Sequence, residues 1–264
     1  MGVQGVNPSV LQSSPDSRVH SVHPACQASF DDLEQLLASS TPRTAVVDCD
    51  GTLWSGDSGY GFMIWSMEQG LISRSASDWI DTRHRAYQSG QVSEARICGE
   101  MTQVYAGISE RELSQAAEVY FDLHVRGNIF PEMQRVVALL RNLGTDLWAV
   151  SSTNKWVIAP GARAFSIPEH RVLAAEVSVA SGILTDHLLD VPTDEAKVAA
   201  LHRVGVDAPD LVFGNSIHDL AMLRIARHSF PVNPSTALLA AGRELGWRYL
   251  MPAMAQPSPA AVLG

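Results

Sequence analysis

Short apolar runs alternate with longer amphipathic stretches along most of the chain. Four runs have the character of buried strands, and each ends where polar residues begin: 45–47, 147–150, 211–213 and 230–232. Residues 131–143 have the apolar spacing of a helix, with a proline at the start and Gly144 after the end. Strands that alternate with helices predict a parallel sheet, and ligands bind beyond the carboxyl ends of such strands.

One long segment departs from this alternation. Residues 78–87, 93–105 and 109–124 all have helical patterns, and no strand is predicted between them. We therefore expect a helical insert over 58–127, placed after the first strand and covering the edge of the sheet. Residues 1–29 are rich in Ser, Pro, Gly and Gln, and 253–264 are rich in Pro and Ala, so both ends are predicted to be flexible tails.

Composition narrows the function classes. The 264 residues are 46% hydrophobic and 18% charged, enough to bury a real core. A formal net charge of -9 without a long basic run argues against a nucleic-acid partner. No apolar run has the length of a membrane span, and Cys26, Cys49 and Cys98 fit neither a disulfide framework nor a metal-ligand set. These features predict a soluble, cytoplasmic protein without a membrane partner; they leave its oligomeric state open.

The first candidate for chemistry is Asp48-Cys49-Asp50-Gly51-Thr52, directly after the apolar run 45–47. Residues two apart at a strand end point to the same side, so the two carboxylates lie close together. Such like charges need a metal ion or a shared proton, which favours a catalytic role. The alternative is a turn in which Asp50 and Gly51 only make the bend.

Two further polar groups follow other strands or stand out by residue type. Ser151 and Ser152 come after the run 147–150, where a hydroxyl and backbone N–H groups could bind an anion, although a helix cap would have the same sequence. Lys197 is one of two lysines, the other being Lys155, which indicates a specific role; a surface lysine remains the alternative.

A fourth group follows the run 211–213. Gly214, Asn215, Ser216 and Asp219 form a tight turn and an oxygen-rich helix start, and oxygen ligands suit Mg²⁺. His218 lies within this group, and we interpret it as a hydrated loop histidine rather than a base.

The order and spacing of these groups resemble the haloacid dehalogenase (HAD) superfamily, in its phosphoserine-phosphatase-like branch, from about residue 43 to 252. Residues 48–52 match its D-x-D-G-T motif, Ser151 its second-motif hydroxyl, Lys197 its third-motif cation, and 214–219 its metal motif. Residues 172–186 also resemble the hairpin that precedes the lysine. The resemblance implies an α/β fold, a Rossmann-like three-layer parallel-sheet core over 30–57 and 128–252, with a small all-helical cap over 58–127.

The same resemblance implies a hydrolase mechanism. Asp48 would attack a small phosphate monoester and form an aspartyl phosphate, while Asp50 would act as general acid and base. Ser151, Ser152 and Lys197 would bind the phosphate. The cofactor would be Mg²⁺, with a metal site formed by Asp48, the Asp50 carbonyl, Asn215 and Asp219.

One departure from the family pattern keeps alternatives open. The family usually has a metal-binding Asp where this chain has Asn215, and an amide adds no negative charge. A protein of the same fold that binds phosphorylated ligands without turnover therefore stays a hypothesis, as does a phosphotransferase that passes the phosphoryl group to an alcohol.

Substrate recognition is the least determined feature. Asp57 lies where phosphoserine phosphatases have an acidic residue near the substrate amine, but it would equally cap the following helix. Arg83 and Arg85 are candidates for binding a substrate carboxylate, and surface ion pairing explains them equally well.

Overall fold

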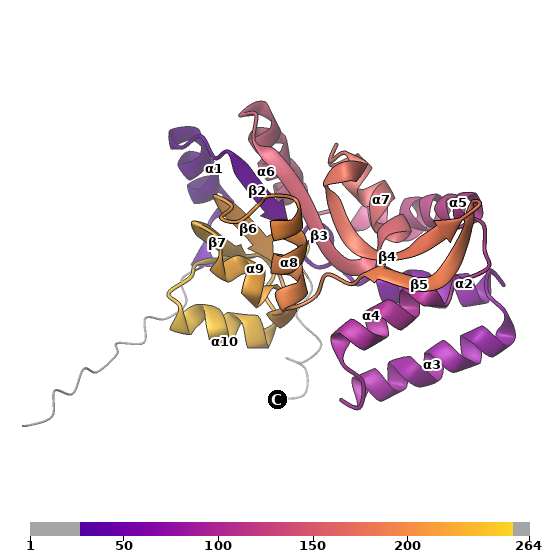
Figure 1. Ribbon diagram of the computed structural model, residues 1–264. Helices are drawn as coiled ribbons and strands as arrows, with labels where there is room; N and C mark the ends of the chain where they lie inside the picture. Colours follow the sequence, from indigo (N-terminus) through magenta and orange to yellow (C-terminus); the bar gives the residue numbers. More distant parts are fainter. Residues whose placement is uncertain (1–26, 256–264) are drawn as a thin grey trace, which may run out of the picture.

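The computed structural model describes residues 27–255 (Figure 1). Of the tails predicted over 1–29 and 253–264, the parts 1–26 and 256–264 lie outside the described residues. Residues 27–29 belong to the fold, because strand β1 (Gln27–Ala28) pairs in parallel with β8 (Tyr249–Leu250) and buries Ala28. The predicted N-terminal tail is therefore too long by these residues.

A six-stranded sheet forms the centre of the molecule, with the order β5-β4-β3-β2-β6-β7. Its strands are β2 (Thr44–Val47), β3 (Asp146–Asn154), β4 (Val172–Ala180), β5 (Ile183–Asp190), β6 (Leu211–Gly214) and β7 (His228–Pro231). All neighbouring pairs are parallel except β4 and β5, which form an antiparallel hairpin. The predicted parallel sheet is confirmed.

Helices cover both faces of this sheet. Alternate side chains of one strand enter different cores: Ala45 and Val47 join the larger apolar cluster, and Val46 joins the smaller one. The larger cluster is completed by α1 (Phe30–Ser39), α6 (Pro131–Asn142) and α7 (Lys155–Ala164); the smaller one by α8 (Glu195–Arg203), α9 (Leu220–Arg224) and α10 (Thr236–Glu244). The result is the three-layer arrangement expected from the sequence.

Between β2 and α6 the described residues contain isolated bridges but no strand, and they form six helical elements. These are α2 (Ser58–Glu68), α3 (Arg74–Gln88), α4 (Glu94–Gln103) and α5 (Glu110–Tyr120), followed by a π-helical turn (Phe121–Val125) and a 3-10 turn (Arg126–Asn128). Figure 1 shows α4 in magenta beside β5 and α3 on the far side of α4, and α4 also contacts β3 and β4. We call this segment, 58–127, the cap; its bounds as a separate unit stay a proposal.

Helix α2 is the cap element that the sequence pattern did not predict. Its glycines, Gly59 and Gly61, weaken helix propensity, but a Cβ atom at Gly61 would lie 2.1 Å from the Tyr120 hydroxyl. Close packing against the end of α5 therefore selects glycine here. Tertiary contacts outweigh the local preference.

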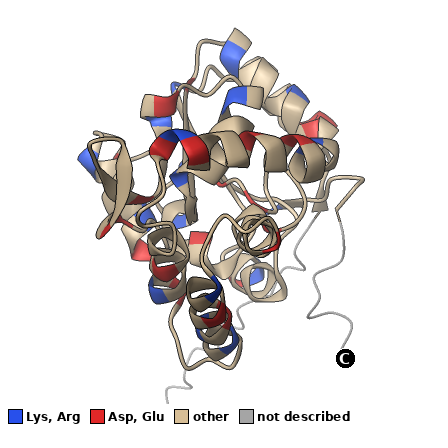
Figure 2. Ribbon diagram, turned by 90° about the vertical axis from the view of Figure 1, so that its right-hand side faces the viewer, with Lys and Arg blue, Asp and Glu red and all other residues tan. Residues whose placement is uncertain are grey.

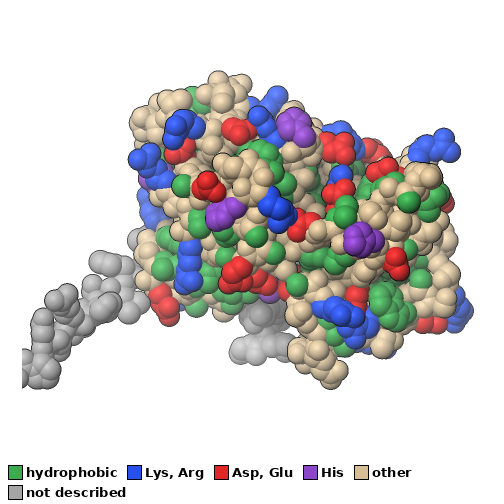
Figure 3. All heavy atoms as spheres, viewed as in Figure 1, with side chains coloured by type: hydrophobic (Ala, Val, Ile, Leu, Met, Phe, Trp, Pro, Cys, Tyr) green, Lys and Arg blue, Asp and Glu red, His purple; other side chains and the backbone are tan. Residues whose placement is uncertain are grey.

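Charged residues are interspersed over the described surface. Figure 2 shows Lys and Arg positions alternating with Asp and Glu along the helices, and the face in Figure 3 carries both signs of charge between small apolar patches. None of the helices within 27–255 is both long enough and apolar enough to cross a membrane.

Candidate active site

A cavity of about 260 Å³ lies between the carboxyl ends of the strands and the cap. The ends of β2, β3 and β6 bring Asp48, Ser151 and Asn215 to its floor. The side facing the cap is lined by residues from α2, α3 and α4, among them Gly59, Phe62, His84, Tyr87, Glu94, Ile97, Cys98 and Met101. Residues from separate parts of the chain thus share one enclosed volume.

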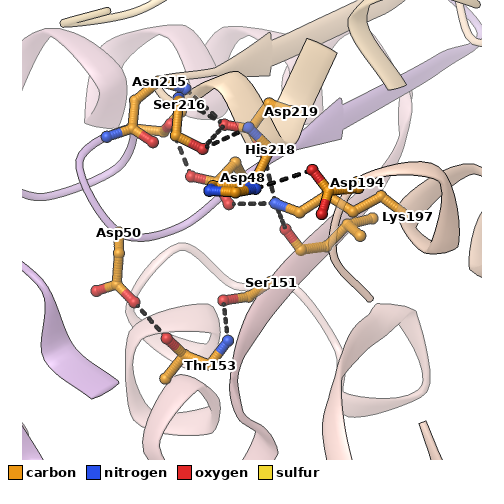
Figure 4. A network of polar contacts seen from close by, with 12 residues as sticks. Asp48, Asp50, Ser151, Thr153, Asp194, Lys197, Asn215, Ser216, His218 and Asp219 are labelled. Carbon is orange, nitrogen blue, oxygen red and sulfur yellow. Dashed lines mark hydrogen bonds and ion pairs between the residues drawn. The ribbon is translucent and has the colours of Figure 1, made fainter. Parts of the chain in front are cut away.

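Asp48, Lys197 and Asp219 form a buried ionic triad at the cavity floor; Asp48 and Lys197 line the cavity, and the fully buried Asp219 does not (Figure 4). The Lys197 Nζ atom donates to Asp48 Oδ1 at 2.7 Å and to Asp219 Oδ1 at 2.5 Å. Burial lowers the pKa of Lys197, but the charges of Asp219 and Asp48 outweigh this and raise it overall. Burial and the charge of Asp219 raise the pKa of Asp48 to about 7, despite the opposing effect of Lys197. The floor therefore has more negative charge than one ammonium offsets.

Asp219 is held by donors on both carboxylate oxygens. Its Oδ2 accepts from the backbone N–H groups of Asn215 (2.8 Å) and Ser216 (2.9 Å), while Oδ1 accepts from Lys197. A Cβ atom at Gly214 would lie 2.7 Å from the Asp219 Cβ, so the turn requires glycine. These contacts favour a role for Asp219 in positioning Lys197 and the turn, and its predicted metal ligation stays a prediction.

Asp50 has different surroundings from Asp48. Its Oδ1 accepts from Trp54 Nε1 and from the Ser58 backbone N–H, both at 2.7 Å, and its Oδ2 accepts from Thr153 Oγ1 at 2.8 Å. Three donors thus orient this carboxylate at the cavity wall. The alternative of a simple turn residue does not account for them, and the sequence reasoning identified neither Trp54 nor Thr153.

The loop that follows Asp50 is packed against the fourth motif. Gly51 has a φ of +74°, and a Cβ there would lie 1.8 Å from Asn215 Nδ2. Glycine therefore allows the Asn215 side chain to lie directly on this loop. The neighbouring Thr52 Oγ1 donates to Asp48 Oδ2 at 3.0 Å and orients the carboxylate.

Ser151 and Ser152 both line the cavity. Ser151 is 2% exposed, and its Oγ accepts from the Thr153 backbone N–H at 3.1 Å. The capping residue of α7 is Asn154, whose side chain accepts from the Trp156 N–H at 3.0 Å. Ser151 is therefore not the helix cap that the sequence left open.

Of the three residues suggested for substrate specificity, Asp57 lines the cavity. It also caps α2, accepting from the Tyr60 N–H at 2.8 Å. Desolvation by the surrounding protein atoms and the charge of Asp50 raise the pKa of Asp57 to about 7, although part of its side chain is exposed. Arg83 pairs with Glu100, and Arg85 with Asp81, and neither arginine is among the lining residues.

His218 is not the hydrated loop residue that we expected. Its Nδ1 lies 2.8 Å from Asp194 Oδ1, and its Nε2 lies 3.7 Å from Glu94 Oε2 on the cap. The ring is half-buried because these two carboxylates approach it from different elements. Lys155, the second lysine, lies outside the cavity and pairs with Glu176 at 2.8 Å.

The donor set at the floor suits a hard divalent cation. Asp48 and Asn215 offer side-chain oxygens, and the Asp50 backbone offers a carbonyl, the types of ligand that Mg²⁺ accepts together with water. The negative charge of Asp219, which after burial contributes most to the raised pKa of Asp48, points the same way. Within 27–255 no group of three or more His, Cys, Asp and Glu could hold a metal, so amide and backbone oxygens would have to contribute.

Comparison with known proteins agrees with this geometry. A family model described as haloacid dehalogenase-like hydrolase matches residues 45–224. A histidinol-phosphatase of Neisseria meningitidis serogroup C (strain 8013) is 23% identical over 217 residues, which cover 78% of this chain and 97% of that protein. A protein of unknown function from Bordetella pertussis Tohama I has a TM-score of 0.71 at 23% identity, covering 80% of this chain and 99% of that one. A phosphoserine phosphohydrolase-like protein from Francisella tularensis subsp. tularensis SCHU S4 has a TM-score of 0.54 at 15% identity, covering 84% and 98%.

Proposed function

The chain belongs to the haloacid dehalogenase-like hydrolases, and from this premise we propose that it is a magnesium-dependent phosphatase acting on a small phosphate monoester. The relatives whose names mention phosphatase activity support the reaction class. The observation that carries the proposal is the pair of carboxylates with different surroundings on one cavity. Asp48 contacts a buried ammonium, and Asp50 is oriented by three neutral donors.

Asp48 is the nucleophile in this proposal. A carboxylate oxygen of Asp48 attacks the phosphorus and forms a new P–O bond, while the bond to the leaving oxygen breaks. Lys197 and Ser151 lie where they can bind phosphoryl oxygens, and Lys197 also orients Asp48. The product of this step is an aspartyl phosphate and a free alcohol.

Asp50 moves the protons. It donates one to the leaving oxygen, and then accepts one from the water that attacks the aspartyl phosphate. That second step releases inorganic phosphate and restores the Asp48 carboxylate. The hydrogen bonds from Trp54, Ser58 and Thr153 keep the Asp50 carboxyl group oriented through both transfers.

Asp48, the Asp50 carbonyl and Asn215 would hold Mg²⁺, which supplies positive charge to the phosphoryl oxygens when bound. The hypothesis of a binding protein without turnover accounts less well for Asp50, because binding alone requires no oriented proton donor. The side chains that the mechanism needs are all present in the cavity.

The test is phosphate release from a panel of monoesters that includes p-nitrophenyl phosphate, histidinol phosphate and phosphoserine, with Mg²⁺ or with excess chelator. We expect release only with the metal ion, and we expect Asp48→Asn to reduce it to background. Asp122→Asn makes the same substitution at an exposed ion pair of the cap and serves as the control. Substantial phosphate release by the Asp48→Asn variant would overturn the proposal. The absence of release by the wild type on every ester would overturn it too.

A further inference from the structure

Asp194 has a backbone conformation that is unusual for a residue with a side chain. It directly precedes α8, the helix that carries Lys197, and its φ and ψ are +51° and −130°. The Ala196 N–H donates to the Thr193 carbonyl at 2.9 Å, so residues 193–196 form a type II′ turn with Asp194 at the first central position. Glycine is the usual residue there, because a Cβ atom makes this conformation strained. The surrounding contacts of Asp194 therefore offset the strain.

Both the main chain and the side chain of Asp194 bind His218, in the segment after β6. The Asp194 N–H donates to the His218 carbonyl at 3.1 Å, and Asp194 Oδ1 lies 2.8 Å from His218 Nδ1 (Figure 4). An ionised carboxylate only accepts, so Nδ1 carries the hydrogen whether the ring is neutral or charged. Glu94 Oε2 lies 3.7 Å from Nε2, which is beyond hydrogen-bond distance. Within the described chain, the hydrogen bond that orients the ring is therefore the one to Asp194.

This contact joins the two segments that carry the floor residues. Lys197 follows Asp194 by about one helical turn, and its N–H donates to the Asp194 carbonyl at 3.2 Å. Asp219 follows His218 directly and accepts from Lys197 Nζ at 2.5 Å. The two segments are thus joined at both ends, by the pair of Asp194 and His218 and by the pair of Lys197 and Asp219. This closed arrangement restricts the ammonium to its position beside Asp48.

Helix capping and stability do not explain the aspartate. The side chain of Asp194 makes no capping hydrogen bond to α8, and glycine would form the same turn and the same main-chain bond to His218 without strain. The side chains of Asp194 and His218 are 45% and 30% exposed, and an ion pair this exposed stabilises a protein less than such strain costs. What the aspartate adds is the contact between its carboxylate and the His218 ring.

We propose that Asp194 is a positioning residue for the reaction at the cavity floor. Through His218 it fixes the fourth-motif turn against the start of α8, and so keeps the Lys197 ammonium between Asp48 and Asp219. The inference rests on the phosphatase function proposed above and adds a residue to that site. Asp194 is not among the residues that line the cavity, so it acts through His218 and Lys197 and not by contact with the substrate.

The test begins with steady-state hydrolysis of p-nitrophenyl phosphate with Mg²⁺ by the full-length protein. Asp194→Gly keeps the turn but removes the carboxylate, and it should lower kcat by about tenfold or more while KM changes by less than about threefold, because displaced groups lose transition-state contacts. Asp194→Asn keeps an oxygen that accepts from Nδ1–H and should stay within about threefold of the wild-type kcat. Ser181→Gly, at a φ of +53° in the turn between β4 and β5, is the control and should leave kcat unchanged.

A double-mutant cycle tests whether Asp194 acts through the ring. His218→Gln removes the ring, and adding Asp194→Gly to it should then lower kcat by less than about twofold further, because the two residues share one interaction. Independent, additive losses would contradict the positioning role. Loss of the folded state in Asp194→Gly, seen by circular dichroism, would show that the contact serves stability and would contradict it as well.

NMR of the histidine rings without substrate separates this inference from the phosphatase proposal. The wild type and Asp194→Asn should show a hydrogen-bonded Nδ1–H signal that is absent from Asp194→Gly and from His218→Gln. If the wild type releases phosphate and Asp194→Gly retains the wild-type kcat, the phosphatase stands and the positioning role is wrong, even where the NMR signal is lost. If no protein releases phosphate, the phosphatase proposal fails and the positioning role fails with it.

Discussion

The floor and the cap end of the cavity are built in different ways. On the floor, functional residues follow strand ends whose register is set by main-chain pairing; the Asp48 N–H, for example, donates to the Phe213 carbonyl at 2.9 Å. At the cap end, Asp57 and Glu94 stand at the starts of α2 and α4, and no strand pairing positions these two helices, although the Ser58 N–H at the start of α2 donates to Asp50. The floor residues are therefore positioned by strand pairing, and the cap residues by the starts of helices.

The two regions also differ in how their charges are satisfied. The floor carboxylates Asp48 and Asp219 share the buried Lys197, whereas Glu94 leaves an oxygen without a partner. A paired and buried set preserves one reaction geometry. The cap, by contrast, carries an acceptor without a hydrogen-bond partner among the described residues, on a side of the cavity that the floor groups do not occupy. The comparison assigns the chemistry to the floor and the selectivity to the cap.

The largest expected effect comes from removing the floor ammonium. Lys197→Met leaves Asp48 and Asp219 buried without their cation, which should cost about 3–5 kcal/mol of unfolding free energy. It should also reduce kcat by about 10²–10³-fold, because a charge near the phosphoryl oxygens is lost. Urea unfolding and steady-state kinetics measure the two effects.

Lys155→Met is the matched control, since Lys155 is the other lysine and pairs with Glu176 at a more exposed position. We expect its cost to stay within about 1 kcal/mol, as for surface pairs. Equal losses for the two variants would show that the buried triad has no special importance for the floor.

The second prediction tests whether Asp50 transfers protons while Asp48 acts as the nucleophile. Asp50→Asn preserves the size of the side chain but removes proton transfer, which should lower kcat by about 10²–10⁴-fold for alkyl phosphates. The loss should be much smaller for p-nitrophenyl phosphate, whose leaving group needs no proton. Kinetics on both esters decide this, and a uniform loss would mean that Asp50 acts on binding instead of on the leaving oxygen.

Much of the fold was predictable because its signals are local. The four apolar runs lie within β2, β3, β6 and β7 or overlap them, and the predicted hairpin over 172–186 lies within β4 and β5. Helix α2 was missed because its glycines are required by close contacts with Tyr120 and Thr153. Both residues are distant in the sequence, so the local pattern does not indicate these contacts. Helix ends such as the start of α3 at Arg74 were misjudged because Ser73 supplies the cap.

The same difference between local signals and long-range contacts decides which residues of the site could be predicted. Asp48, Asp50, Ser151 and Lys197 were identified because they follow motifs, and the structure places them on one cavity. Thr153 and Glu94 were not identified, because their importance arises from contacts between distant parts of the chain; Thr153 and Asp50 are 103 positions apart. Arg83 and Arg85 looked suitable by residue type, but their carboxylate partners within the cap could not be known from spacing alone.

The smallest expected effect concerns Asn215, the residue where the floor departs from the family pattern. Its side chain lies on the loop at Gly51 and lines the same cavity as Asp48, whose pKa is raised by burial and then by the charge of Asp219. Asn215→Asp adds a further charge there with little change in shape. Without Mg²⁺ it should therefore destabilise the protein slightly, by about 1 kcal/mol or less.

With Mg²⁺ bound, the effect of Asn215→Asp on stability should change from destabilising to stabilising, because a hard cation binds more tightly to a charged ligand. We expect Asn215→Asp to lower the Mg²⁺ concentration for half-maximal activity by up to about tenfold, equivalent to 1.4 kcal/mol. The rise in melting temperature between chelator and saturating Mg²⁺ should also be larger than in the wild type, since a ligand stabilises the state that it binds. Asn142→Asp, at an exposed position of α6, adds the same charge far from the floor and should change neither quantity.

If the Asn215 variant leaves both quantities unchanged, the Asn215 oxygen is not a metal ligand, and its amide N–H would instead donate to the phosphate. The floor would then hold its cation through Asp48 and backbone oxygen, and its contrast with the cap would rest on the Lys197 triad alone.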